Sequence, residues 1–394
     1  MSFTGSLFWL SLFFLLYSYV LYGILVYVLV KLKRVLGRKK GTPAGDWEPE
    51  VTLVVSAFNE EDFIATKIAN TMKLDYPLSK LKVIFVTDGS TDDTPGIVSR
   101  YPAVQLLHQP ERRGKVAAMN RSIPFVTTPY VIFSDANTLL NEDCIRKIVQ
   151  HYREASVGGV AGEKKIITGS DAQAAGVGEG LYWKYESFLK RMDSEFYSVV
   201  GAAGELFSLR TELYEHTAED VVIEDFVQSL NICRKGYVVR YEPGAFAMET
   251  PSLSMAEEQK RKIRISAGAF QAMVLLKDLF NVFKYPVLSF QFISHRILRW
   301  TVCPLCLPLL FIANAILVWR GSGIFYEVVF SLQVLFYVLA FAGWIMASRN
   351  IKIKALYVPY YFLFMNISVY FGFRRFIMKR QSVLWERAAR QQAA

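Results

Sequence analysis

Two kinds of hydrophobic pattern divide the chain. Residues 7–31 form a long apolar run with no internal charge, and three more apolar runs follow at 300–319, 325–346 and 356–373. Runs of about 20 apolar residues can cross a bilayer as helices. From about 50 to 270, short apolar stretches alternate with polar ones. This pattern predicts a globular domain between an N-terminal and a C-terminal membrane region.

The central region alternates β-branched apolar runs with helical segments. The predicted strands are 51–58, 82–88, 104–108 and 130–136. The predicted helices lie near 60–74, 91–100 and 114–122. Apolar strands separated by helices favour a parallel sheet covered on both faces, so the predicted fold class is α/β. Ligands of such sheets bind beyond the carboxyl ends of the strands.

The boundaries follow from these runs. Residues 268–285 mix apolar and charged positions, which predicts a helix on the membrane surface. The expected segments are an N-terminal anchor with a basic flank (1–40), the globular domain (50–270), amphipathic interfacial helices (271–298), two to three spans (299–375) and a basic tail (376–394).

Charge indicates the orientation of the membrane segments. The chain has 45 Lys and Arg against 35 Asp and Glu, a net charge of +10, and much of the excess flanks the apolar runs. Basic flanks mark the cytoplasmic side of a span. We therefore expect a multi-pass protein of a cell inner (plasma) membrane with its globular domain in the cytoplasm. No nucleic-acid-binding motif is present, so no nucleic-acid partner is expected.

The number of C-terminal crossings stays open. Three full crossings after one N-terminal span would put the basic tail outside, although both the tail and the linker 348–354 are basic and favour the inside. Either one apolar run is not a true span or the tail is an exception.

The cysteines do not point to disulfides or metal. Four cysteines are too few for a disulfide framework in 394 residues. Cys303 and Cys306 have a CxxC spacing, but they lie within the apolar run 300–319. We interpret them as small apolar residues of a membrane helix.

Two acidic residues end predicted strands. Asp88 lies in TDGSTDDT and Asp135 lies in SDAN. Carboxylates at such strand ends can bind a ribose or base, or hold a divalent cation that bridges a diphosphate. Turns and helix caps also favour Asp, Gly and Ser, so this second interpretation stays open.

An acidic pair and a lysine add candidate chemistry. Glu224 and Asp225, in VIEDF, open a predicted helix, where they either favour the helix dipole or supply a general base. Lys115, in RRGKVAAMN, follows a glycine at a helix start. That position suits phosphate contacts, and a solvated basic turn is the alternative.

The order of the motifs is more specific than any one of them. The array is AFNEE (57–61), LDYP (74–77), TDGSTDDT (87–94), RRGKVAAMN (112–120), SDAN (134–137), VGAAGELFSLR (200–210), VIEDF (222–226) and RKGYVVRYEP (234–243). It resembles the family 2 glycosyltransferases, which include cellulose, chitin and hyaluronan synthases and bacterial exopolysaccharide enzymes. The resemblance covers about residues 50–270.

The resemblance implies a GT-A fold, which binds a nucleotide-sugar donor, and inverting transfer with magnesium or manganese. The residues implied to hold or approach the nucleotide are Asn59, Glu60, Asp88 and Lys115. Asp135 would belong to the metal-binding DxD-type motif. Asp225 would be the catalytic base, with Glu224 beside it.

Two motifs depart from the family's pattern. The DxD-type motif ends in Asn137, whose amide oxygen can bind a cation with less charge than a carboxylate. The nearest match to the QxxRW motif of processive members is QKRKI (259–263), which lacks the arginine and the tryptophan in register. Arg261, Lys262 and Arg264 remain placed for phosphate. The missing tryptophan, which stacks beneath the acceptor sugar in the family, argues against processive polymerisation.

The resulting hypothesis is inverting transfer of a sugar, with a UDP-sugar as the family's default donor, to a membrane-associated or lipid-linked acceptor in polysaccharide or glycan synthesis. The alternative is a processive β-polysaccharide synthase that also exports its polymer. A non-catalytic scaffold is disfavoured because Asp135 and Asp225 are present. A nucleotidyltransferase is disfavoured because SAFNEEDF (56–63) is not a Gly-rich phosphate loop. The sugar, the nucleotide of the donor, the acceptor, the linkage and the oligomeric state stay open.

Overall fold

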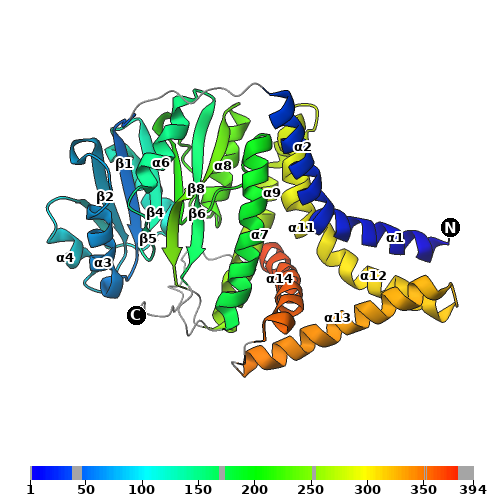
Figure 1. Ribbon diagram of the computed structural model, residues 1–394. Helices are drawn as coiled ribbons and strands as arrows, with labels where there is room; N and C mark the ends of the chain where they lie inside the picture. The colour runs from blue at the N-terminus through cyan, green and yellow to red at the C-terminus, as the bar shows by residue number, and fades with distance from the viewer. Residues whose placement is uncertain are drawn as a thin grey trace.

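The computed structural model describes residues 2–37, 47–167, 174–250, 254–349, 351 and 353–379, with the backbone alone for 174–182 and 354. An α/β domain lies beside a group of long helices that extend away from it (Figure 1).

One eight-stranded mixed sheet forms the centre of the domain. Its strands are β1 (Val51–Ala57), β2 (Leu81–Asp88), β3 (Gln105–Gln109), β4 (Tyr130–Asp135), β5 (Leu139–Leu140), β6 (Val157–Ile166), β7 (Leu206–Arg210) and β8 (Val238–Glu249). Their order is β3-β2-β1-β4-β7-β6-β8-β5. The first four strands are parallel, as predicted, whereas β7 runs antiparallel to both β4 and β6. The four predicted strands are confirmed, the third shifted by one residue.

The helices of the domain alternate with the strands along the chain, and the last of them follows β8. They are α3 (Glu61–Met72), α4 (Thr94–Ser99), α5 (Lys115–Ser122), α6 (Cys144–Gln150), α7 (Ala174–Phe196), α8 (Glu224–Arg234) and α9 (Met255–Leu275). Short 3-10 turns lie at Leu78–Lys80, Ile123–Phe125, His151–Arg153, Thr211–Leu213 and Lys277–Phe280. The predicted helices before β2, β3 and β4 are confirmed, with α4 shorter than expected.

Side chains that alternate between the two faces of the sheet pack into two apolar cores. Along β1, Leu53 and Val55 join one core with Ile64 and Ile68 of α3. Val54 points into the other core, which includes residues of α5 and α8. Every residue of β1 is buried, as expected of a central strand covered on both faces.

The order in which the strands are added to the sheet changes sides at β1. Strands β2 and β3 lie on one side of β1, and β4 lies on the other. Such a switch point opens a crevice at the carboxyl ends of the two strands. Asn59 follows β1 and Asp135 ends β4, so the fold brings both residues to this crevice.

The segment after α9 differs from the single surface helix expected over 268–285. Residues 268–275 close α9, and the chain then makes a 3-10 turn and a loop. A further helical stretch follows as α10 (Pro286–Phe292), a π turn (Ile293–Ile297) and α11 (Leu298–Trp300). Leu288 and Phe292 belong to one of the domain's own cores, so apolar packing against the domain governs this segment.

Four helices among the described residues are long and apolar enough to cross a membrane. The first, Phe3–Leu36, comprises α1 (Phe3–Leu16), a π turn (Tyr17–Leu21) and α2 (Tyr22–Leu36), and the others are α12 (Val302–Trp319), α13 (Ile324–Ser348) and α14 (Lys354–Ile377). Helix α1 packs along α12, whereas α2 packs on α7 of the domain. Cys303 and Cys306 are buried and unpaired in α12, which agrees with their interpretation as membrane-helix residues.

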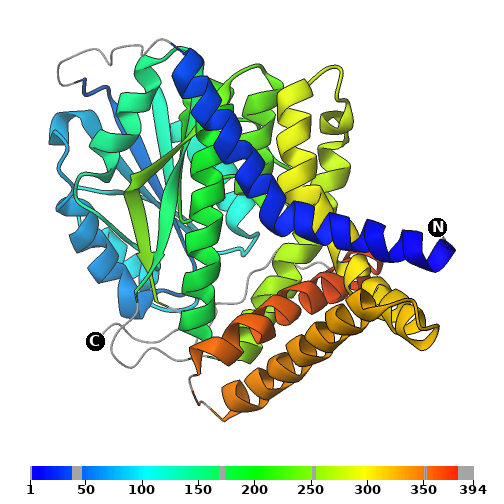
Figure 2. The ribbon, with the colours of Figure 1, turned by 45° about the vertical axis from the view of Figure 1, so that its right-hand side comes forward.

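Helix α14 lies against the domain along much of its length. It packs on both α9 and α13, and Figure 2 shows α13 and α14 side by side. The Tyr361 hydroxyl donates to Glu258 near the start of α9, at 3.2 Å. Further along, a Cβ at Gly372 would lie 2.4 Å from the Cβ of Ser266, so the two helices approach closely.

Candidate active site

The loops after β1 and β2 are bonded to each other. Asn59 has a left-handed backbone (φ 52°), and its Oδ1 accepts from the Thr91 N–H at 2.8 Å. The Glu60 N–H donates to Oγ1 of Thr94 at 2.8 Å. Asp92 accepts from the Thr94 N–H at 3.1 Å, as the turn interpretation of this motif predicts.

Asp88 holds the loop that leads into α5. Its Oδ2 accepts from the N–H groups of Arg113 (3.0 Å) and Gly114 (2.6 Å). Gly114 has a φ of 98°, a conformation that glycine adopts readily. The other carboxylate oxygen of Asp88, Oδ1, lies 3.6 Å from the Arg121 guanidinium. Asp88 therefore positions Lys115, the first residue of α5.

Lys115 points at the carboxylates of two separate motifs. Its Nζ lies 2.7 Å from Oδ1 of Asp135 and 3.0 Å from Oε1 of Glu224. Burial acts to lower the pKa of Lys115, but the charges of Asp135, Glu224 and Asp225 outweigh it and raise the pKa well above its usual value. A Cβ at Gly204 would lie 2.9 Å from Nζ of Lys115, so the glycine leaves room for the lysine.

Asp135 and Asn137 offer two oxygens at the end of β4. Burial raises the pKa of Asp135, against the lowering effect of Lys115. In the described part of the chain, Oδ1 of Asn137 is buried without a hydrogen-bond partner. An unsatisfied buried oxygen beside a carboxylate fits a divalent cation. No group of three or more His, Cys, Asp or Glu side chains suited to a metal was found among the described residues, so other ligands would complete this set.

The acidic pair of VIEDF opens α8, as predicted. Burial raises the pKa of Asp225 to about 7, and the charge of Glu224 adds to this effect while Lys115 opposes it. A carboxyl group with a pKa near neutrality suits general base catalysis. Glu224 is itself tied to Lys115, which leaves Asp225 as the better candidate for the base.

A single cavity of about 720 Å³ joins most of the predicted residues. The predicted residues in its wall are Glu60, Lys115, Asp135, Asn137, Glu224, Asp225, Arg261 and Arg264. Asn59 and Asp88 are not among its lining residues, and the contacts above give them roles in loop structure.

Helix α9 contributes the basic part of the wall. Arg261 pairs with Glu258 at 3.1 Å, and Lys262 lies 3.5 Å from the same carboxylate. Arg264 has no hydrogen bond or ion pair within the residues that the structure describes. Among the charges that act on it are those of Glu224 and Asp135, which places its guanidinium near the acidic cluster.

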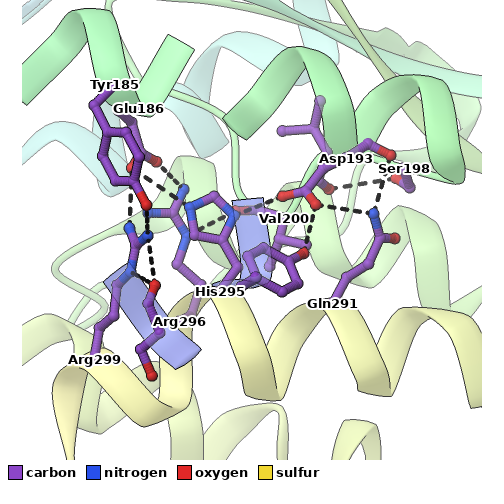
Figure 3. A network of polar contacts seen from close by, with 12 residues as sticks. Tyr185, Glu186, Asp193, Ser198, Val200, Gln291, His295, Arg296 and Arg299 are labelled. Atoms are coloured by element: carbon purple, nitrogen blue, oxygen red, sulfur yellow. Dashed lines mark hydrogen bonds and ion pairs between the residues drawn. The ribbon is translucent and has the colours of Figure 1, made fainter. Parts of the chain in front are cut away.

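The cavity also has a wall that the motifs did not indicate. Figure 3 shows Glu186 and Asp193 of α7 facing His295, Arg296 and Arg299. His295 Nδ1 lies 2.6 Å from Asp193, and Glu186 contacts Arg296 at 2.5 Å. Burial acts to raise the pKa of Glu186, but Arg296 and His295 outweigh it and hold the pKa well below its usual range.

These residues were not among the predicted site residues. For His295, Arg296 and Arg299, the sequence did offer one signal of a functional role. These charged residues lie in SHRILR (294–299), directly before the apolar run that begins near residue 300. Buried charges next to a span usually have paired or functional roles. Gln291 of α10 donates to Asp193 at 3.2 Å, and Arg299 of α11 lies 3.8 Å from Glu186, so the network joins both helices to α7. Arg296, Arg299 and Trp300 line the cavity.

Comparisons with known proteins agree with this geometry. Residues 52–217 match the family model described as Glycosyl transferase family 2. The poly-beta-1,6-N-acetyl-D-glucosamine synthase of Staphylococcus aureus (strain MSSA476) is 25% identical over 249 residues, 59% of this chain and 57% of the relative. The synthase of the same name from Staphylococcus epidermidis is 22% identical over 273 residues, 65% of this chain and 63% of the relative. The chain thus spans less than two thirds of the length of these relatives.

A solved structure shares the fold. The mannosyltransferase from Pyrobaculum calidifontis, solved in complex with GDP-Man and Mn2+, superimposes with a TM-score of 0.70 at 21% identity. The match covers 95% of this chain and 99% of that one, so it includes the flanking helices. With its four candidate spans, the chain is a membrane protein. Its α/β domain has the GT-A fold and contains, at residues 52–217, a family 2 glycosyltransferase domain.

Proposed function

We propose that this protein transfers a sugar, with inversion, from a nucleotide-sugar donor to a membrane-associated or lipid-linked acceptor in polysaccharide or glycan synthesis. The observation that carries the proposal is the cavity in which Asp225 lies near Asp135 and Lys115 and whose wall continues onto α14. A UDP-sugar is the family's default donor.

The donor's diphosphate is assigned to the crevice at the end of β4. Asp135 and the unsatisfied Oδ1 of Asn137 would hold Mg²⁺ or Mn²⁺, and such a cation neutralises charge on the leaving diphosphate. Arg264 supplies a guanidinium without an internal partner among the described residues, and Arg261 lies on the same helix. Asn59, Glu60 and Asp88 order the loops that border the nucleotide.

Asp225 is assigned as the general base. Its carboxylate takes the proton of the acceptor hydroxyl as the hydroxyl oxygen attacks the anomeric carbon. Glu224 and Lys115 position the base and set its charge environment. A base on the face opposite the leaving group gives inversion, so an α-linked donor would give a β-linked product.

The pH dependence of kcat/KM should report the ionisation of Asp225. The carboxylate form is the active one, so kcat/KM should rise through a midpoint near the pKa of about 7. Glu224→Gln removes a like charge and should move this midpoint to lower pH, even if the maximal rate also falls. Steady-state assays from pH 5 to pH 9 measure both midpoints. A midpoint that stays in place or moves upward in Glu224→Gln would contradict the assigned electrostatics.

The acceptor is assigned to the side of the cavity that faces the apolar helices. Lining residues on α14 include Val358, Phe362 and Met365, and Tyr19 contributes from the N-terminal helix. All four belong to candidate membrane spans. A cavity walled by both catalytic acids and membrane helices suits an acceptor that reaches it from the bilayer.

We also propose a topology with the catalytic domain on the cytoplasmic side of a cell inner (plasma) membrane. Helix α14 packs on α9, and Arg375 lines the cavity, which supports a position at the membrane surface for α14. With α12 and α13 as the two C-terminal crossings, the basic linker 348–354 and the basic tail both stay inside. This arrangement resolves the conflict among the basic segments.

A processive synthase is the second candidate, and Trp300 favours it. The position of the motif tryptophan is taken by Ile263. Trp300 nevertheless lines the cavity, and its ring lies 5.3 Å from that of Phe226, the residue after Asp225. An indole in this position could stack on an acceptor sugar in place of the missing tryptophan.

Product length separates the two candidates. The full chain, purified in nanodiscs, is supplied with radiolabelled nucleotide sugars, Mn²⁺ or Mg²⁺, and a membrane lipid extract. We expect a single sugar on a lipid-extractable product. A ladder of high molecular weight would overturn this expectation in favour of the synthase, and Trp300→Ala should then shorten the ladder. No transfer from any donor would contradict both candidates.

A further inference from the structure

Lys190 of α7 is a buried lysine that faces the cavity. Its side chain belongs to the cavity wall, although only 3% of the residue is exposed. Its Nζ lies 5.2 Å from the centroid of the Trp183 ring. Within the part of the chain that the structure describes, it makes no hydrogen bond or ion pair. A buried ammonium group without an anionic partner is costly, so such a position calls for a function.

The acids around Lys190 are engaged elsewhere. Glu186 precedes it by one helical turn, but its carboxylate pairs with Arg296 at 2.5 Å and also contacts His295 and Arg299 (Figure 3). Glu205 pairs with Lys164 at 2.7 Å. Glu163 accepts from the Ser187 hydroxyl at 2.5 Å.

Three carboxylates, those of Glu186, Glu163 and Glu205, act on Lys190, but each of them is bonded to another group. Burial lowers the pKa of Lys190, and the charge of Glu186 offsets this effect only in part, while the nearby charge of Arg296 lowers the pKa further. Lys190 and Arg296 both line the cavity, and Lys190 has no ion pair among the described residues, so an anion bound there would meet two positive charges. An anion bound there would raise the pKa of the lysine and so stabilise its charged form.

This position differs from the one assigned to the donor. The charges that act most on Lys190 are those of Glu186, Arg296, Glu163 and Glu205. For Arg264 they are those of Glu224, Arg261, Asp135 and Arg375. Among the described residues, the cavity therefore offers two cations without a hydrogen bond or ion pair, one beside the catalytic acids and one on α7.

The part of the cavity wall contributed by α14 indicates what kind of molecule carries the anion that would bind at Lys190. Its lining residues Val358, Phe362, Met365 and Val369 are spaced by four, three and four positions. This spacing puts them on one face of the helix. An apolar stripe of α14, the helix assigned to the membrane surface, lies in the wall of the cavity that Lys190 also lines.

We propose that Lys190, with Arg296 beside it, binds the phosphate of a lipid-linked acceptor, whose hydrocarbon chain lies along the α14 stripe. The inference rests on the proposed function, since it concerns the acceptor of the same cavity. The phosphate holds the acceptor in the cavity without reacting, and the donor's diphosphate keeps its own position near Arg264.

Binding measurements on the purified full chain in detergent test this site. The probes are a polyprenyl phosphate, the uncharged polyprenol of the same length, inorganic pyrophosphate, and UDP or GDP with Mn²⁺. Dissociation constants are measured by microscale thermophoresis for the wild type and for Lys190→Gln. Lys184→Gln, an exposed lysine of the same helix, is the matched control, and Lys190→Arg tests whether a positive charge suffices.

We expect the wild type to bind the polyprenyl phosphate at least tenfold more tightly than the polyprenol, about the effect of one charge-assisted contact. Lys190→Gln should remove that preference and leave polyprenol and nucleotide binding unchanged. Lys190→Arg and Lys184→Gln should retain it. The comparison of the two lipids in the wild type applies even if Lys190→Gln fails to fold.

Three results would overturn the proposal. Equal affinity for the two lipids would show that no phosphate site contributes. Pyrophosphate binding as tight as that of the lipid would assign Lys190 to a free phosphate. Weaker nucleotide binding in Lys190→Gln would place it in the donor site. A chain that binds the lipid through Lys190 but transfers no sugar would contradict the proposed function and leave the binding site standing.

Discussion

Asp225→Asn is expected to lower kcat by about 10²–10⁴-fold, the usual contribution of a general base. The amide has nearly the same shape as the carboxylate but cannot take the proton of the acceptor hydroxyl. Asp225 is not one of the residues assigned to the donor, so UDP or GDP should bind with unchanged affinity in the presence of Mn²⁺. Turnover with the donor identified by the product assay, together with calorimetric titration of the nucleotide, measures the two effects separately.

Asp220→Asn is the matched control for this variant. Asp220 lies five residues earlier, is exposed and does not line the cavity, so its neutralisation should leave turnover near the wild-type value. Near-normal turnover in Asp225→Asn would remove the base assignment from this residue. Glu224 would then be the next carboxylate to test, because it is the adjacent acid in the cavity wall.

Asp225→Asn should also change the thermal stability of the folded protein, by an amount that depends on pH. The pKa of Asp225 is raised to about 7 in the folded protein, so ionisation of this carboxyl group destabilises the fold. The cost begins above the unfolded-state pKa of about 4 and is complete above pH 7. Asp225→Asn should therefore raise the melting temperature at pH 8 and leave it nearly unchanged at pH 4. This result would also show that the loss of activity is not a loss of folding.

Asp135→Ala is expected to weaken Mn²⁺ binding, measured in the presence of UDP or GDP, by at least tenfold. Asp135 is the only carboxylate of the DAN motif, and Asn137 alone offers a neutral oxygen. Lys115 would also lose the contact of 2.7 Å that now holds it at Asp135. Calorimetric titration of Mn²⁺ measures the affinity without any need for turnover.

Asn137→Asp makes the complementary change at the same site. It adds the second carboxylate that a DxD-type motif carries, so Mn²⁺ affinity should increase. An unchanged affinity in both variants would place the cation away from the end of β4. An effect of Asp135→Ala without an effect of Asn137→Asp would limit the protein's contribution to one carboxylate.

Local sequence patterns predicted the first half of the sheet and the membrane helices. The strand β1 could be recognised because a central parallel strand is apolar at nearly every position, and VTLVVSA is buried throughout. The C-terminal spans could be recognised because a bilayer demands about 20 apolar residues in succession. Both signals are carried by neighbours in the chain and need no tertiary contacts.

The antiparallel strand β7 and the helical stretch 286–300 were harder to anticipate. Strand β7 pairs between β4 and β6, which are distant from it in the chain. The segment 286–300 contains both apolar and charged residues, and its sequence does not distinguish a membrane surface from a protein core. The buried ion pairs of His295 and Arg296 with α7 show that one face of this segment packs on the domain.

By itself, the sequence determined the α/β fold class, the four candidate spans and the acidic and basic motifs at strand and helix ends, because each depends on short-range periodicity or spacing. Only the tertiary structure decided that Asn59 and Asp88 order loops, that Asp225 has a pKa near neutrality and that Lys190 and Trp300 share one cavity with Asp135. Burial, charge pairing and cavity shape depend on contacts between segments distant in the chain, such as those of Asp193 and His295, and no local pattern encodes them.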